Sequence, residues 1–303
     1  MSTEPPSVVL RTDPSLEPDE IADVDALVRD ATAADGVAPL NEQSLLRLHD
    51  PTATGMLHVR ATTDVGLVGY AIAERDAGVV LECVVKPDHR RSGIGRALVS
   101  AVLDATDRQD VNGWSHGDLP GAAELAAATG FERARILLRM EAALDEPLAE
   151  PTAPDAVTFR TFRPGVDDAA WLAVNARAFA DHPEQGSMSQ RDLDQRIASD
   201  WFDPEGFFLA ERAGEVLGFH WTKVSDGVGE VYVVGVDPDA QGLGLGGALT
   251  RLGLVHLQRR GVRTVELYVE GDNEPALAVY RRLGFVDAAR DVMYARRAIG
   301  GQH

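Results

Sequence analysis

The chain has 303 residues, which is long for one hydrophobic core, so its length predicts two domains of ordinary size. Its 29 basic and 48 acidic residues leave a net charge of −19, which argues against a nucleic-acid-binding protein, because phosphate contacts need clustered Lys and Arg. The apolar runs are no longer than a strand, so we expect no binding to membranes. The first residues lack the features of a signal peptide, and Cys83 is the single cysteine, so we predict a cytoplasmic protein.

The first half of the chain begins with a predicted helix and continues with strands. Ile21, Val24, Leu27 and Val28 recur at helical spacing near its start. Residues 67–74 then form a strand-like run. We expect further strands, a glycine-rich loop, a helix, a strand and a closing helix to complete this half.

Residues 141–157 are rich in proline and lack a sustained apolar pattern, so they predict a linker. The second half then follows the same order of elements. Its first helix is indicated by the spacing of Trp171, Leu172, Val174 and Phe179. The helix after its glycine loop is indicated by the shared face of Ala248, Leu249, Leu252, Val255 and His256. Residues 264–273 read as a strand that ends in turn residues.

The two halves repeat one another in register. Aligning Pro87 with Pro238 places Gly93 on Gly244 without a gap, and a Gly-Phe pair follows in both halves. Repetition at half the chain length indicates two copies of one domain. We therefore predict an α/β protein with an N-terminal domain over residues 1–140, the linker 141–157 and a C-terminal domain over residues 158–303.

The glycine loop of the second half has the chemistry of a phosphate site. Gly242, Gly244 and Gly247 match the spacing of a dinucleotide-binding turn, but such a turn normally opens a βαβ domain, and here the loop lies deep in each half. Both halves share the pattern R/Q-x-x-G-x-G/A. Backbone N–H groups at a helix start bind phosphate without side-chain charge. We therefore expect a phosphate-bearing ligand and disfavour a hydride-transferring enzyme.

With these features the chain resembles the GCN5-related N-acetyltransferase superfamily, whose R/Q-x-x-G-x-G/A loop receives the pyrophosphate of acetyl-CoA. The fold implied for each half is a mixed, mostly antiparallel sheet flanked by helices. More narrowly, the chain is similar to a tandem-domain branch of this superfamily. The stretches that carry the narrower similarity are ADGVAPLNEQ (34–43), FADHPEQG (179–186), WFDPEGF (201–207), GFHWTKV (218–224), GEVYVVGVDP (229–238) and LYVEGDN (267–273).

Acetyl transfer to an amine requires a base and an acid. The attacking amine must be neutral, and we predict Glu230, near the start of the strand leading into the loop, as its general base. Strict alternation would place Glu230 and Tyr232 on the same face as Val234 and Val236. The resemblance implies that Tyr280 protonates the departing thiolate of CoA.

The first half lacks both groups. Residues Val79, Ala126 and Leu119 stand at the positions of Glu230, Tyr280 and Asn273. Glu82 is a nearby carboxylate, but it lies three positions after Val79, and alternation along the strand places it on the opposite face from Cys83. We expect this half to keep a cofactor-type loop without catalysing transfer.

The resemblance also implies the acceptor: the cysteinyl amine of cysteinyl-glucosaminyl-inositol, acetylated directly in a ternary complex as the last step in making a low-molecular-weight thiol. The substrate-binding positions it implies are Glu42, Glu184, Lys223, Glu230 and Tyr268. Alternatives are an aminoglycoside, a polyamine or a protein N-terminus as acceptor, or a non-catalytic acyl-CoA-binding sensor.

The predicted contacts with acetyl-CoA come from both loops. In the second half they are Val234, Gly235, Val236, Gln241, Gly242, Leu243, Gly244, Leu245, Gly246, Gly247 and Asn273. In the first half they are Cys83, Val84, Val85, Arg90, Arg91, Ser92, Gly93, Ile94 and Gly95. We expect no metal and no acyl-enzyme on Cys83, and we predict a monomer because the two domains can pair within one chain.

Overall fold

The computed structural model describes residues 8–76, 78–180 and 183–298. By its internal contacts the chain forms two compact units, one made of Met1–Leu137 and Arg290–His303 and the other of Leu138–Ala289. The strands β6 (Glu132–Ala143) and β12 (Val286–Arg296) each begin in one unit and end in the other. These units therefore differ from a division at the predicted linker, because each takes strand residues from the opposite half of the sequence.

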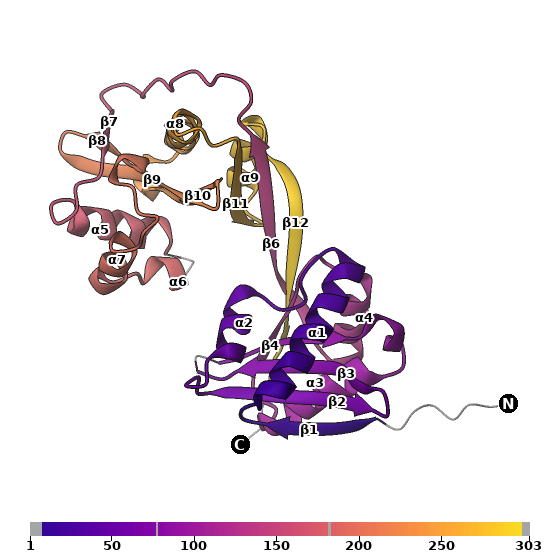
Figure 1. Cartoon of the computed structure of the whole chain (residues 1–303). Coiled ribbons are helices and arrows are strands. Elements are labelled where there is room, and N and C mark those ends of the chain that lie inside the picture. Colours follow the sequence, from indigo (N-terminus) through magenta and orange to yellow (C-terminus); the bar gives the residue numbers. More distant parts are fainter. Residues whose placement is uncertain (1–7, 77, 181–182, 299–303) are drawn as a thin grey trace. The chain divides into compact units, whose positions relative to one another are not determined.

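The first unit is a sheet with the strand order β1-β2-β3-β4-β5-β12 and helices on both faces (Figure 1). Strands β1 to β4 are antiparallel neighbours, whereas β4 and β5 run parallel. Its elements are β1 (Val9–Asp13), α1 (Pro18–Asp35), α2 (Glu42–His49), β2 (Met56–Thr63), β3 (Gly66–Glu74), β4 (Val79–Val85), η1 (Pro87–His89), α3 (Ile94–Ala105), β5 (Val111–Ser115) and α4 (Pro120–Thr129).

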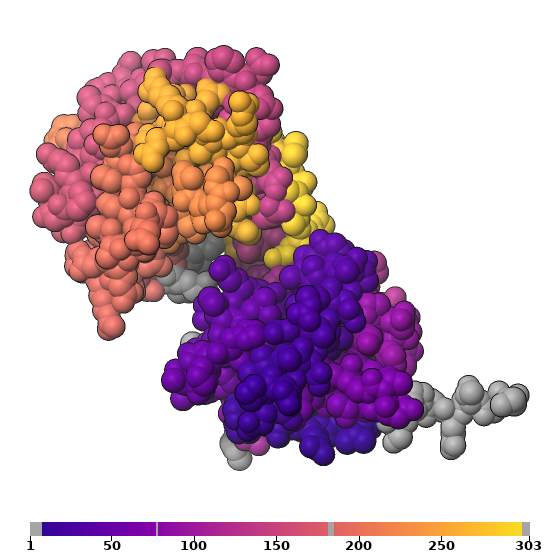
Figure 2. Space-filling model, viewed as in Figure 1, coloured from indigo at the N-terminus to yellow at the C-terminus, as the bar shows by residue number. Residues whose placement is uncertain are grey.

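The predicted apolar stripe of the first helix is confirmed in α1. Val24, Leu27 and Val28 are buried with Tyr70 and Ile72 of β3 on one face of the sheet. The opposite face packs against α3 and α4. Figure 2 shows the N-terminal part of the chain, which includes α1, at the surface of this unit. Burial of this stripe explains why the segment is helical, because most of the stability of a helix in a protein comes from packing of its apolar face.

The second unit repeats the arrangement, with the strand order β6-β11-β10-β9-β8-β7. One face of the sheet packs against α5 and α7, and the other packs against α8. Its elements are β7 (Thr158–Thr161), α5 (Asp168–Ala178), α6 (Pro183–Gly186), α7 (Gln190–Ile197), η2 (Pro204–Gly206), β8 (Phe207–Arg212), β9 (Glu215–Ser225), β10 (Val228–Val236), η3 (Pro238–Ala240), α8 (Leu245–Arg259), β11 (Thr264–Glu270) and α9 (Glu274–Arg282).

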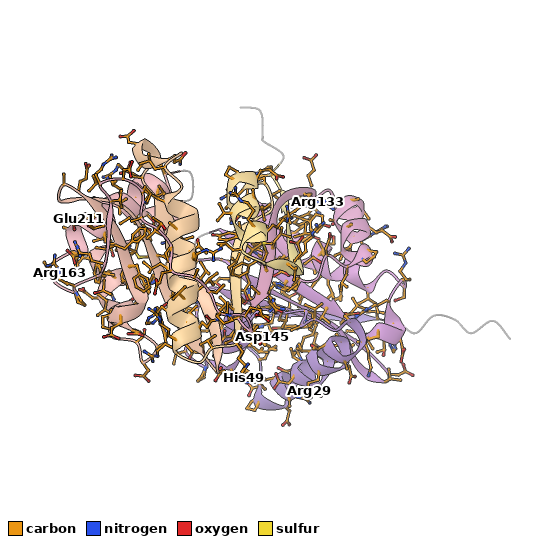
Figure 3. All side chains as sticks on the ribbon, turned by 90° about the horizontal axis from the view of Figure 1, so that it is seen from above. Arg29, His49, Arg133, Asp145, Arg163 and Glu211 are labelled. Atoms are coloured by element: carbon orange, nitrogen blue, oxygen red, sulfur yellow. The ribbon has the colours of Figure 1, made fainter. Side chains whose placement is uncertain are left out.

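Aromatic packing builds the core on the α5 side of this sheet. Phe207 stacks on Trp221 with 4.4 Å between ring centroids, and Trp171 meets Trp221 edge-on at 5.8 Å. At the outer edge, Arg160 pairs with Glu211 across β7 and β8; Figure 3 labels Glu211 and its neighbour Arg163 there. The result is a rigid support beneath the strands that carry the predicted base.

The proline-rich segment is held against the second unit. The first three of its residues belong to β6, and residues 144–157 contain neither helix nor strand. The side chain of Gln258 in α8 donates to the carbonyl oxygens of Leu144 and Glu146, both at 2.8 Å, and accepts from the N–H of Leu148 at 3.0 Å. Among the described residues, no helix is both long and apolar enough to cross a membrane.

Candidate active site

A β-bulge in β10 sets which side chains reach the site. Val231 pairs with Thr222 of β9 and Val233 with the next residue, Trp221, so Tyr232 is the extra residue. Tyr232 packs in the core on the α5 side, whereas Val234 packs on the α8 side. The prediction that Glu230 and Tyr232 share a face with Val234 and Val236 is therefore wrong, because the bulge reverses the alternation.

Glu230 is the last residue of β10 whose pairing with β11 is described; its partner there is Glu266. Oε2 of Glu230 is 3.5 Å from Nζ of Lys223. Burial raises the pKa of Glu230, Lys223 works against that rise, and Glu266 adds to it. With about 20% of its side chain exposed, Glu230 remains accessible and is a stronger base than an exposed glutamate.

Lys223 lies beside two aromatic rings that contact each other, with 4.9 Å between their centroids. Its Nζ lies 5.5 Å from the ring centre of Trp201 and 5.7 Å from that of Tyr232. The hydroxyl of Tyr232 in turn accepts from Nε of Arg196 at 2.9 Å. Trp201 packs on Trp221 and also contacts the lysine of the site.

Tyr280 lies on α9 and is nearly buried, with its ring edge-on to Phe285. Burial raises its pKa to about 12, so the phenol stays protonated at neutral pH. Asn273 precedes the same helix and caps it, because its Oδ1 accepts from the N–H of Ala276 at 3.1 Å. The side chain predicted to flank the cofactor therefore fixes the start of the helix that carries the predicted acid.

The glycine loop ends in the first turn of α8. Gly242 and Gly244 have φ angles of 82° and 77°, which L side chains rarely adopt. Gly244 is the N-cap and has no side chain to accept from the first N–H groups of α8. These groups can bind an anion such as a pyrophosphate. The rest of the predicted loop is placed around them, with Leu243 exposed and Leu245 buried.

The first unit contains the same loop in the same conformation. Arg91 and Gly93 have φ angles of 62° and 90°, matching Gly242 and Gly244. The guanidinium of Arg90 pairs with both carboxylate oxygens of Asp35, at 2.7 and 2.8 Å.

Cys83 precedes this loop on β4. Burial, and then the charge of Glu82, raise the pKa of the Cys83 thiol to about 11. The thiol therefore stays protonated at neutral pH and is a poor nucleophile.

Pairing between strands refines the comparison of the units. Val80 of β4 pairs with Glu74 as Glu230 pairs with Lys223, so the counterpart of Glu230 is Val80 and not Val79, because β4 has no bulge.

The helix ends bear out the other two predicted pairs. The N–H of Phe131 donates to the carbonyl of Ala126, as that of Phe285 does to Tyr280. Leu119 is the N-cap of α4, as Asn273 is of α9. The first unit thus lacks a carboxylate and a tyrosine at these positions.

A buried charge cluster in the first unit was not predicted. Nε2 of His116 is 2.8 Å from Oε1 of Glu82, and its Nδ1 is 3.0 Å from Oδ2 of Asp291. The second oxygen of Glu82 accepts from the N–H of Asn41 at 3.1 Å. Burial disfavours the imidazolium, but the two carboxylates outweigh it and raise the pKa of His116 to about 9.

The remaining predicted substrate residues are dispersed. Glu42 is the exposed first residue of α2 in the first unit, next to the helix cap Asn41. Tyr268 is 50% exposed on β11. Glu184 belongs to α6, but its side chain lies outside the described residues. Among the described residues, no group of three His, Cys, Asp or Glu side chains is arranged to hold a metal.

Sequence reasoning also missed the charges beside Glu230. Arg139 of β6 pairs with Glu266 at 3.0 Å and with Glu141. A signal existed in β11, where Glu266, Tyr268 and Glu270 alternate with buried residues and so share one face. The same signal marks Arg139, because Leu138, Met140 and Ala142 of β6 are buried and alternate with Arg139 and Glu141.

Comparison with known proteins follows the division into two copies. The model of the acetyltransferase (GNAT) family matches residues 171–285, and that of the acetyltransferase (GNAT) domain matches residues 56–133. Both matches include a glycine loop and the strand before it.

Relatives match almost the whole chain. A mycothiol acetyltransferase of Thermomonospora curvata is 53% identical over 277 residues, covering 91% of this chain and 93% of its own. A mycothiol acetyltransferase of Streptomyces coelicolor is 51% identical, covering 92% of each. Among solved structures, a GCN5-related N-acetyltransferase from Sphaerobacter thermophilus has a TM-score of 0.77 at 25% identity, covering 97% of both chains. A tandem GNAT protein from the clavulanic acid pathway has a TM-score of 0.68 at 21% identity, covering 98% of this chain and 100% of its own, and shows the same fold.

Proposed function

Because the chain belongs to the mycothiol acetyltransferases, tandem-domain N-acetyltransferases of the GNAT family, we propose that it acetylates the cysteinyl amine of cysteinyl-glucosaminyl-inositol with acetyl-CoA. The observation that carries this proposal is the half-buried Glu230, beside the end of the β10–β11 pairing and on the strand that leads into the glycine loop. The final product would be mycothiol.

In the proposed reaction, Glu230 accepts a proton from the substrate ammonium, directly or through one water. A free α-amino group has a pKa of about 8, so a carboxylate with a raised pKa is a sufficient base when it is correctly placed. The amine nitrogen then attacks the carbonyl carbon of the thioester and, once the N–C bond has formed, loses its second proton to water. Direct transfer needs no enzyme nucleophile, which agrees with the protonated thiol of Cys83.

Breakage of the C–S bond leaves the thiolate of CoA, which takes a proton. We assign this proton to the hydroxyl of Tyr280, because burial keeps the phenol protonated throughout the neutral range, and the phenolate then regains a proton from water. A thiol has a pKa of about 8.5, so protonation below this pH favours departure.

The donor would be held by the backbone of the second unit. The N–H groups at the start of α8 suit the pyrophosphate, and the last residues of β10, Val234 to Val236, suit the pantetheine arm. Lys223 and Tyr268 are proposed to contact the acceptor from this unit, and Glu42 is proposed to contact it from the first unit. The side chain of Glu184 is proposed as a further contact.

We further propose that the first unit is not catalytic. Its loop has the conformation of an acetyl-CoA loop, but Val80 and Ala126 stand in place of the base and the acid. Acetyl-CoA titrated into the full chain would reveal two binding events if both loops bind, and Gly244→Val would remove only the event coupled to turnover.

The test is to mix the protein with acetyl-CoA and cysteinyl-glucosaminyl-inositol, and to follow release of the CoA thiol. We expect release that falls by about 100- to 10,000-fold in Glu230→Gln, since this is the usual contribution of a general base. Release with aminoglycosides, polyamines or peptide N-termini but not with this amine would discard the proposed acceptor. Binding of acetyl-CoA without transfer to any amine would favour an acyl-CoA-binding sensor.

A further inference from the structure

Two carboxylates lie side by side at the proposed site. Glu230 on β10 and Glu266 on β11 are directly paired residues of parallel strands, so their side chains leave the same face of the sheet. About 20% of the Glu230 side chain and 25% of the Glu266 side chain are exposed. Both can therefore be reached by a ligand from solvent.

Each carboxylate has a cation from a different strand. Lys223 of β9 lies 3.5 Å from Glu230, and Arg139 of β6 lies 3.0 Å from Glu266. Among the described residues, no ion pair joins Lys223 to Glu266 or Arg139 to Glu230. Like charges on paired residues repel one another unless a cation bridges them.

An alkylammonium group of the chain itself already lies beside Glu230. The Nζ of Lys223 contacts one carboxylate and lies over the faces of Trp201 and Tyr232. Carboxylates and aromatic faces are the groups that bind ammonium ions in proteins. The position between Glu230 and Glu266 offers the same chemistry to a cation that comes from outside the chain.

We propose that Glu266 is a substrate-binding carboxylate that, together with Glu230, receives the acceptor amine as its ammonium ion. This inference rests on the proposed function only in requiring a primary amine as acceptor. An ammonium group has three N–H donors, so it can bond to both carboxylates and retain one donor for water. The bound ammonium group lies between the carboxylates of Glu230 and Glu266 and so offsets the repulsion between their like charges.

The two carboxylates then have different tasks. Glu230 takes one proton from the ammonium, and Glu266 keeps its hydrogen bond to a remaining N–H. That bond orients the nitrogen lone pair toward the thioester. Acetylation turns the amine into a neutral amide, which removes the charge that both carboxylates attract. The same arrangement would favour binding of the acceptor and release of the product.

The groups facing Glu230 fix the expected pH dependence. They are Lys223 from β9 and Glu266 from β11. Tyr232 of the same strand as Glu230 lies beside Lys223, and its hydroxyl accepts from Arg196 of α7. Loss of the negative charge of Glu266 lowers the pKa of Glu230, since Glu266 raises it. Hence Glu266→Gln should move the acidic limb of kcat/KM to lower pH, and Lys223→Gln should move it to higher pH.

The experiment compares Glu266→Gln with Glu141→Gln. Both residues contact Arg139, but only Glu266 is paired with Glu230. We expect Glu266→Gln to weaken binding of the cysteinyl amine by about 10- to 100-fold, with KM rising more than kcat falls. Binding of the neutral N-acetylated product should not change, and Glu141→Gln should resemble wild type.

Equal binding of the amine by Glu266→Gln and Glu141→Gln would overturn the inference, as would equal loss of amine and product binding. If wild type transfers acetyl to no primary amine, the proposed function fails instead. Should Glu266→Gln not fold, as judged by thermal unfolding, Glu266→Asp serves as the second variant. It keeps the charge, so it should retain the pH profile and bind the amine more tightly than the product.

Discussion

At the scale of single residues, partial or complete burial prepares the two proposed catalytic groups for opposite tasks. Burial raises the pKa of both Glu230 and Tyr280. For the carboxylate, a raised pKa means a greater affinity for the substrate proton. For the phenol, it means that the proton is still present at neutral pH when the thiolate of CoA forms. Two groups shifted in the same direction can therefore act as base and acid, because their unshifted values lie far apart.

We expect Tyr280→Phe to reduce kcat by about 10- to 100-fold at pH 6.5. The defect should be smaller at pH 9.5, because a thiol with a pKa of about 8.5 can then leave as a stable thiolate without being protonated. Steady-state release of CoA across this pH range measures the effect. Since the pKa of Tyr280 is about 12, its own titration does not enter the range.

Tyr294→Phe is the matched control, because Tyr294 is a buried tyrosine of the first unit. It should leave the pH profile of turnover unchanged. A defect of Tyr280→Phe that is the same at every pH would argue against proton donation and for a packing role beside Phe285.

Residues that act in the proposed chemistry could be predicted only where a local motif marks them. Glu230 and Tyr280 lie in stretches similar to a known family. Glu82, His116 and Asp291 lie 34 and 175 positions apart along the chain, so no local pattern brings them together. Their contact arises from the fold.

At the scale of elements, the repeated loop was predictable and the bulge was not. Glycines at Gly93 and Gly244 are required by positive φ angles, so the turn is recorded in residue type. Arg91 adopts the same conformation as Gly242 without being a glycine. The bulge at Tyr232 lies in a run of β-branched and aromatic residues that suits any strand, so it left no mark on composition.

Gly244→Ala tests the loop as a cofactor element. A Cβ there meets no atom within 4 Å, but the φ angle of 77° makes alanine cost about 1 kcal/mol. We expect this loss of stability together with a several-fold rise in KM for acetyl-CoA, because the helix start would lose its orientation. Urea unfolding and steady-state kinetics measure the two effects.

Gly261→Ala is the control for backbone strain. Gly261 follows α8 at its other end, has a φ angle of 80° and is likewise free of close atoms. Its substitution should cost about as much stability and leave KM unchanged. If both variants raised KM equally, the loop effect would come from a weakened α8 and not from the loop itself.

At the scale of the whole molecule, each unit depends on both halves of the sequence. The first unit includes residues from Arg290 onward, and the second begins at Leu138. The repeat indicated two copies of one domain but could not indicate this exchange of strand residues, because equivalent strands suit either sheet. Asp291, near the C-terminal end of the chain, thereby reaches His116 and Glu82 of the first half.

This charge cluster makes the first unit sensitive to alkaline pH. The folded pKa of His116, about 9, is above the usual value of 6.5, so its contribution to stability is complete below about pH 6.5 and is lost as pH rises through about 9. The contribution is on the order of 3 kcal/mol. We expect His116→Gln to destabilise the first unit strongly at pH 6.5 and much less at pH 9.5, where wild type has also lost the imidazolium. Hydrogen exchange of peptides from β4 and β5 measures this, because it reports on the first unit alone.

His49→Gln is the control, because it removes an exposed histidine that pairs with Asp25 (Figure 3). It should change the exchange of these peptides at neither pH. A constant difference between wild type and His116→Gln at both pH values would mean that the imidazole acts by packing against Trp114 and not by its charge.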